Sequence, residues 1–278
     1  RVSPFRKLSF SSGGELATRD CGRLDRSRGV VAFTALVAGI LMVFLSFIPN
    51  SSIALQAWLL LIGCSSIVYG VHGYVLYSRI DGADRYWRGG ESCVKFVPPV
   101  IVEVAEVLVN AMMTVSSLVS LCLALLSGMD IPGDRRALSF SLLMTAASIL
   151  AWTAVPIYVP GSPAIELRPG GMTIWPLGIG RRYVPWDSCP VVVGSKKVAG
   201  VQRAVIAYET GATYVSITSI PLGCEQLRRV VAFYGAHPEL RGELKQQRGL
   251  ERVRELMYTT VDDIEEELKN GSARTVSE

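Results

Sequence analysis

Long apolar runs alternate with short polar stretches over the first 160 residues of the chain. Four of these runs are long enough to cross about 30 Å of hydrocarbon as helices. They cover residues 29–48, 53–77, 98–128 and 138–159. A tight turn follows the first run, and a polar loop at residues 78–95 separates the second from the third. The pattern predicts a four-helix transmembrane domain over residues 29–160.

After Gly161 the charged residues reach the density of soluble proteins, and short strand-like runs replace the long apolar ones. Six strands are predicted, at residues 164–168, 172–175, 182–186, 190–193, 203–208 and 213–218. A helix follows, and four apolar residues share one of its faces: Leu227, Val230, Val231 and Tyr234. We therefore predict an α+β domain at residues 161–236, built as a small barrel or a curved sheet capped by this helix.

The two ends of the chain differ from both regions. Residues 1–28 are rich in Ser, Gly and Arg and are predicted to be mobile. Residues 237–278 are predicted to form a helical tail that starts at Pro238 and breaks, for instance, at Gly249. An apolar stripe runs along this tail: Leu250, Val253, Leu256 and Met257. The stripe predicts docking on a partner or on the domain itself.

Lys and Arg gather on one set of helix ends. Seven precede the first predicted span, four lie between spans two and three, two lie between spans three and four, and the first turn has none. Cytoplasmic flanks carry this excess, so both termini and the domain are predicted to be cytoplasmic, in a multi-pass plasma-membrane protein. The net charge of +4 is too small and too scattered to indicate nucleic-acid binding.

Polar residues mark one face of the third predicted span. They recur at three- and four-residue spacing: Glu103, Glu106, Asn110, Thr114 and Ser117. Such a face avoids lipid, and His72 on the second span lies at a similar depth. One interpretation is a cluster of His72, Glu103, Glu106 and Asn110 that relays protons or holds a cation or a lipid headgroup. The other is an interhelical hydrogen-bond clamp, or glutamates hydrated near the surface.

Smaller signals concern packing and lipid contact. Ala35 and Gly39 have the small-xxx-small spacing that lets helices approach closely, within the chain or with a partner. Arg181-Arg182 and Lys196-Lys197 fall in predicted turns. If both turns faced the membrane, each basic residue would add about 1 kcal/mol of attraction to anionic headgroups. The alternative is that both turns are simply solvated.

No catalytic, cofactor or metal motif is recognised. The six cysteines, at positions 21, 64, 93, 122, 189 and 224, form no C-x-x-C pair, so neither a metal site nor a disulfide framework is predicted. The only two histidines are His72 and His237, and neither has a recognisable nucleophile elbow beside it. The chain is therefore predicted not to be an enzyme and to need no cofactor.

One stretch of the domain resembles a known family. AIELRPGGMTIWPLGIGRRYVPWDSCPVVVG, followed by two strands and CEQLRRVVAFYGAHPELRGEL, is similar to bacterial pleckstrin-homology-like (PH-like) domains found beside transmembrane helices in actinobacterial membrane proteins. The LRPGGMT opening and Val184-Pro185-Trp186 carry the likeness, which covers about 80 residues. The resemblance implies a partly open barrel with a C-terminal helix, and binding or assembly rather than catalysis. Cys189 departs from the apolar residue of the family pattern.

Three function classes follow from these patterns. The leading prediction is a non-catalytic scaffold or accessory subunit, in a membrane protein complex or homo-oligomer, whose domain binds a protein partner. The second is an anionic-lipid-binding or lipid-handling protein. The third is a small proton- or ion-coupled transporter that uses the intramembrane cluster.

Overall fold

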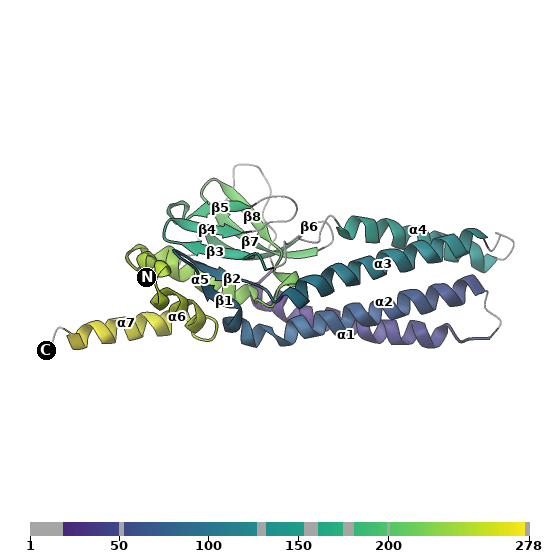
Figure 1. The fold of residues 1–278 in the computed structure, drawn as a ribbon, viewed down its shortest axis with the longest axis horizontal. Helices are drawn as coiled ribbons and strands as arrows, with labels where there is room; N and C mark the ends of the chain where they lie inside the picture. The colour runs from purple at the N-terminus through teal and green to yellow at the C-terminus, as the bar shows by residue number, and fades with distance from the viewer. Residues whose placement is uncertain are drawn as a thin grey trace.

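The computed structural model describes residues 19–49, 53–126, 132–152, 161–174, 181–198 and 201–275. Four long helices lie side by side along the long axis of the molecule (Figure 1). Two sheets and three shorter helices gather at one end of this bundle. The described residues thus form a helical bundle and a sheet-rich region.

Two helical hairpins make up the bundle: α1 (Cys21–Leu45) with α2 (Ile53–Ser78), and α3 (Val100–Leu126) with α4 (Pro132–Trp152). By length and composition, α1, α2 and α3 can each cross a membrane, whereas the apolar part of α4 is the shorter segment Leu138–Leu150. These three helices indicate a membrane-embedded protein. The last part of the predicted fourth span, residues 153–159, lies outside the described residues.

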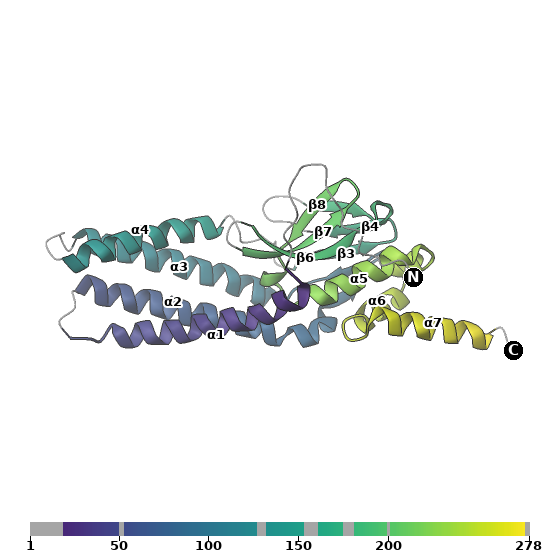
Figure 2. The same cartoon turned by 180° about the vertical axis from the view of Figure 1, so that it is seen from behind.

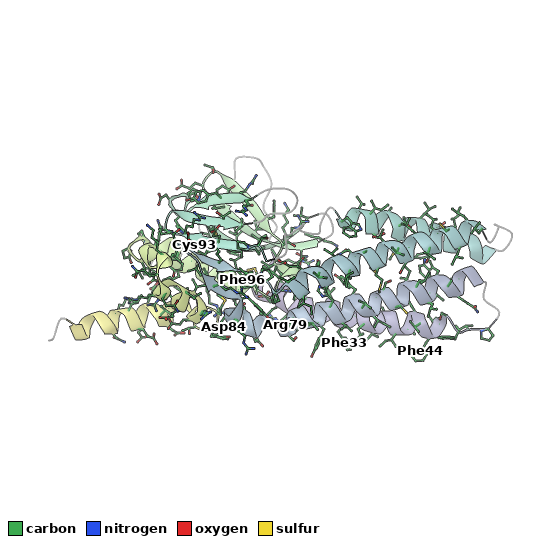
Figure 3. The ribbon with its side chains drawn as sticks, viewed as in Figure 1. Phe33, Phe44, Arg79, Asp84, Cys93 and Phe96 are labelled. Carbon is green, nitrogen blue, oxygen red and sulfur yellow. A yellow bond between two sulfur atoms is a disulfide. The ribbon has the colours of Figure 1, made fainter. Side chains whose placement is uncertain are left out.

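The outer faces of the bundle are apolar. Phe33 and Phe44 project from α1 away from the other helices (Figure 3), and they are 64% and 71% exposed. Apolar surface of this extent is unfavourable in water. The bundle surface is therefore suited to hydrocarbon.

Glycines let α1 and α2 approach backbone to backbone. A Cβ atom added to Gly39 would lie 2.7 Å from the carbonyl oxygen of Gly63. A Cβ atom on Gly70 would lie 2.7 Å from the backbone nitrogen of Leu36. Because these distances are below van der Waals contact, side chains are excluded there. The close packing predicted at Gly39 thus occurs within the chain.

The sheet-rich region contains two antiparallel sheets. The first has five strands in the order β1 (Trp87–Gly89), β2 (Val94–Phe96), β3 (Ile165–Arg168), β4 (Gly171–Ile174) and β5 (Arg182–Pro185). The second has the order β6 (Val191–Val198), β7 (Val201–Tyr208) and β8 (Gly211–Val215). The six strands predicted after Gly161 correspond to β3 to β8. The two sheets are not joined by strand pairing, so a closed barrel is not present among the described residues.

The first two strands come from the segment between α2 and α3 that was predicted as a polar loop. A 3₁₀ helix (η1, Ile80–Tyr86) leads into β1, and β2 pairs with β3, placing Lys95 opposite Glu166. Trp87 and Phe96 are fully buried, with their rings edge to face at 5.1 Å. The loop prediction is wrong here because these apolar residues belong to the core of the domain.

The helix after β8, α5 (Cys224–Ala236), covers the core with the face that its sequence predicted. The tail consists of η4 (Pro238–Lys245), α6 (Gln247–Glu255) and α7 (Val261–Thr275). The break predicted at Gly249 is wrong, since Gly249 lies inside α6. The predicted stripe of α6 is buried, and the indole N–H of Trp87 donates to the sulfur of Met257 at 3.3 Å. The tail therefore docks on the domain itself.

His237 connects α7 to the end of α5. Its Nδ1 lies 2.9 Å from the carboxylate of Glu239, and its Nε2 lies 3.1 Å from that of Glu265 in α7. Burial lowers the pKa of His237, but the hydrogen bonds to the two carboxylates outweigh burial and raise this pKa above its ordinary value. The protonated ring thus bridges two acidic residues.

Substituting Gly39 with Ala should destabilise the α1–α2 hairpin. The added methyl group meets backbone atoms that cannot move independently, so we expect a loss of about 1–3 kcal/mol in unfolding free energy. Unfolding of the protein in mixed micelles measures this loss. Gly242→Ala is the control, because nothing lies within 4 Å of the added Cβ atom at Gly242. Equal stability of the two variants would contradict the close approach.

The docking of α7 should depend on pH. A raised pKa in the folded state means that the stabilisation is fully present below about pH 6.5 and is lost as the pH rises through the raised pKa. Hydrogen exchange of the α7 amides, corrected for intrinsic rates, should therefore accelerate at higher pH. The variant His237→Asn should remove the dependence. A pH-independent α7 in the unmodified protein would contradict the bridge.

Candidate functional site

The first turns of α1 attach the bundle to the sheet-rich region. Arg19 pairs with Ser195 of β6 through two backbone hydrogen bonds of 2.8 and 2.7 Å. A disulfide joins Cys21, at the start of α1, to Cys224, at the start of α5, and Figure 2 shows the two helix starts side by side. Residues 19–28 are therefore packed, contrary to the predicted mobility. The earlier part of that segment lies outside the described residues.

The disulfide contradicts the prediction made from cysteine spacing. Its cysteines are 203 positions apart in sequence, yet their Cα atoms lie 5.1 Å apart. Only the fold brings them together. Disulfides persist in oxidising compartments, whereas the Lys and Arg distribution predicts that this end of the protein is in the reducing cytoplasm. The two observations thus indicate opposite compartments for the same end.

Asp25 in α1 caps α5 from outside that helix. Its carboxylate accepts hydrogen bonds from the backbone N–H groups of Cys224 at 2.9 Å and Glu225 at 3.2 Å. The residue before α5 is Gly223, which has no side chain to supply a cap. A helix start has unpaired N–H groups and a positive dipole end, so a carboxylate is favoured there. Asp25 supplies this carboxylate from the membrane helix.

Arg28, one turn further along α1, is only 8% exposed. Its guanidinium donates to the carbonyl oxygens of Leu222 at 2.8 Å and Ile220 at 2.7 Å, and more weakly to that of Thr218 at 3.5 Å. A buried cation is costly unless it is hydrogen-bonded. The turn between β8 and α5 supplies the acceptors, so α1 is held to the domain by a cation as well as by a carboxylate.

Two residues of the predicted intramembrane cluster meet. Nε2 of His72 in α2 lies 3.2 Å from the Glu106 carboxylate in α3. Glu106 also interacts electrostatically with Tyr69 and with Arg28. The pair links the two hairpins near the junction, which is the geometry of an interhelical clamp.

The other two residues of that cluster point elsewhere. Glu103 accepts a hydrogen bond from the backbone N–H of Gly161 at 3.2 Å, and its Oε1 is buried without a partner among the described residues. The amide of Asn110 donates to the carbonyl of Glu106 within α3. The predicted four-residue cluster is thus one cross-helix pair, one contact with the chain after α4 and one local bond.

A cavity of about 220 Å³ lies beside Arg28, where α1 and α2 meet β7. Five polar side chains line it together with apolar residues: Ser27, Arg28, Tyr69, Gln202 and Thr218. The Oε1 atom of Gln202 is buried and has no hydrogen-bond partner among the described residues. No pattern in the sequence points to this cavity, because its walls come from four separate segments.

A larger groove, of about 820 Å³, runs between the start of β6, α5 and the link from α6 to α7. Val191, Ala232 and Val261 contribute apolar walls. Arg228 and Glu225 also line it and are ion-paired with one another. Sequence reasoning missed the groove, since its three walls are distant in the chain.

Three of the four residues in the two basic pairs occupy edge strands of different sheets. Arg182 lies in β5, while Lys196 and Lys197 lie in β6, so the assignment of these three residues to turns is wrong. Arg181 lies just before β5, outside the strand. Strand pairing joins each edge strand to one neighbour within its own sheet and does not join β5 to β6. Strand pairing therefore does not bring the two basic pairs together into one site for a lipid headgroup.

The described residues give no sign of a metal or thiol centre. No group of three or more His, Cys, Asp or Glu side chains among them could hold a metal ion. Cys93 is buried and donates to Glu166 at 3.2 Å. Burial and the Glu166 carboxylate raise the pKa of the Cys93 thiol, which disfavours the nucleophilic thiolate.

Comparison with known proteins gives no match: no family model, no curated protein and no solved structure is significantly similar to this chain. The resemblance to PH-like domains stays a prediction from the sequence.

The disulfide can be tested by trapping thiols at the moment of cell lysis. Alkylation followed by peptide mapping should modify the four free cysteines and leave Cys21 and Cys224 as one linked peptide pair. Reduction under denaturing conditions should then make Cys21 and Cys224 reactive as well. Alkylation of Cys21 or Cys224 before reduction would show that the pair is a dithiol in the cell.

Proposed function

We propose that this chain is a non-catalytic, multi-pass membrane protein that serves as a scaffold or accessory subunit and holds a protein partner on its sheet-rich domain. The observation that carries the proposal is the rigid junction at Asp25 and Arg28, together with the open groove beside α5. A domain held in fixed orientation to the membrane can position a partner. The His72–Glu106 contact supports a clamp rather than a relay for transport.

The contacts of the bundle support four spans. The start of α1 and the region after α4 touch, so both lie on one side of any membrane that the bundle crosses. The hairpin between α2 and α3 joins the same sheet as β3, which places it on that side too. The chain leaves this side along α3 and must return along α4. The 21 residues of α4 reach about 31 Å, of which the apolar segment Leu138–Leu150 accounts for about 20 Å.

The cytoplasmic side is the proposed location of the domain. Among the flanks of the predicted spans, residues 1–28 and 78–95 hold the most Lys and Arg. The described part of the first, residues 19–28, and the second both lie at the bundle end next to the domain. Positive charge of this kind is typical of cytoplasmic flanks. The disulfide opposes this assignment, so the sidedness rests on charge and needs direct measurement.

A PH-like architecture is part of the proposal. Two antiparallel sheets followed by the single helix α5 support it, and the buried Trp186 of the predicted motif donates its indole N–H to the carbonyl of Arg168 at 2.7 Å.

The groove supports a protein as the partner. It is open and lined by apolar side chains, and its floor is formed by α5, which the junction holds against α1. Val191 is 43% exposed there, and Tyr258 is 59% exposed. An apolar segment of a partner would cover these side chains and gain the free energy of burying them.

Purification in nanodiscs from the native membrane, followed by mass spectrometry, tests the proposal. A defined protein should co-purify with the chain and should be lost from the groove variants Ala232→Arg and Val191→Asp. Tyr183→Asp is the control, because Tyr183 is 54% exposed on β5, away from the groove. A chain that emerges alone contradicts the scaffold. A partner that stays bound to both groove variants contradicts the groove as its site.

A further inference from the structure

The cavity beside Arg28 lies at the boundary between charged and apolar sequence. Arg28 is the last charged residue before the apolar run of α1, which begins at Gly29. On one side the cavity is lined by Gln202 and Thr218 of the domain, and on the other by Val31 and Ala32 of α1. A molecule in this position would meet polar groups at one end and the exposed side chain of Val31 at the other.

The polar end offers hydrogen-bond donors. The three carbonyl bonds of Arg28 use three of the five N–H groups of its guanidinium. The hydroxyl groups of Tyr69 and Thr218 also line the cavity. Arginine binds phosphate well because its planar N–H groups match phosphate oxygens. A phosphate group is thus the anion that this arrangement fits.

The same end also offers an unpaired acceptor. The Oε1 atom of Gln202 is buried and lacks a donor among the described residues, and a buried acceptor without a partner is costly. A ligand with a hydrogen-bond donor close to its phosphate group would pair with this oxygen. Ethanolamine has such a donor in its ammonium group, whereas the quaternary nitrogen of choline has no N–H.

The surrounding charges favour a ligand without net charge. Arg28 interacts electrostatically with the carboxylates of Asp25 and Glu106. Asp25 is bonded to the start of α5 and Glu106 to His72, so both negative charges remain near the cation. An anionic headgroup would be repelled by these two carboxylates, whereas the ammonium group of a zwitterionic one would offset the charge of its phosphate.

We propose that the cavity at the α1–α2–β7 junction binds the phosphoethanolamine headgroup of a phospholipid. The phosphate accepts from Arg28, the ammonium group donates to Gln202, and an acyl chain lies on α1 along Val31, which is 53% exposed. A volume of about 220 Å³ accommodates a headgroup but not a whole lipid. The proposal is independent of the protein partner at the groove.

Native mass spectrometry of the protein released from nanodiscs tests this site. The nanodiscs contain phosphatidylethanolamine and phosphatidylcholine in equal amounts with identical acyl chains. One retained phosphatidylethanolamine per chain is expected, at about tenfold excess over phosphatidylcholine, as for one hydrogen bond to a charged group. Equal retention of the two lipids overturns the proposal.

Variants at Gln202 avoid disturbing the structural bonds of Arg28. Gln202→Leu removes the acceptor and should abolish the excess, whereas Gln202→Glu keeps a carbonyl-type acceptor and should preserve it. Gln247→Leu is the matched control, since Gln247 is exposed on α6. Loss of the excess in this control, or its persistence in Gln202→Leu, overturns the assignment of the site.

Two further experiments distinguish a lipid from a soluble ligand and a zwitterionic headgroup from an anionic one. Soluble phosphoethanolamine, added to phosphatidylcholine nanodiscs at the concentration of the lipid, should not be retained, because it lacks the acyl chain. Its retention would show a soluble ligand rather than a lipid. Phosphatidylglycerol in place of phosphatidylethanolamine should be retained at the level of phosphatidylcholine. Retention of phosphatidylglycerol at the level of phosphatidylethanolamine would overturn the requirement for a zwitterionic headgroup.

Discussion

The insertion of the first turns of α1 into the sheet-rich region is the constraint on which the rest of the structure depends. Arg28 enters a buried position and finds its acceptors only in the carbonyls of the turn before α5, while Asp25 supplies the cap that Gly223 cannot provide. Removing either partner would leave a buried charge or an open helix start. The membrane helix and the domain therefore form one folded unit.

Several features follow from this attachment. It brings the start of α1 and the strands and helix that follow α4 to the same end of the bundle. It holds α5 in place, and α5 forms a wall of the groove. The junction also encloses the cavity beside Arg28, whose polar lining combines bundle and domain residues. The two proposed sites thus share one structural origin but differ in location and ligand.

Local patterns predicted the elements better than their assembly. The positions of α1, α2 and α3, the strands after Gly161 and the buried face of α5 follow from hydrophobic periodicity, which is a local property. The strand character of Trp87 and Phe96 was hidden in a charged segment. Trp87 pairs with Phe96, and Phe96 pairs with Ile165 of β3, which is far away in the sequence. Of the predicted site residues, only His72 and Glu106 met. The disulfide, cavity and groove are long-range features that no spacing in one sequence reveals.

The sidedness of single cysteines tests the account most directly. Exposed positions at the domain end and at the far end of the bundle would be replaced one at a time, in a background whose exposed free cysteines are serine: Arg19 and Glu209, and Phe47 and Leu126. Labelling of intact and permeabilised cells with a membrane-impermeant thiol reagent then reports the side of each position. We predict that Arg19 and Glu209 share one side and that Phe47 and Leu126 share the other. Opposite sides for Arg19 and Glu209 would contradict both the junction and the four-span arrangement.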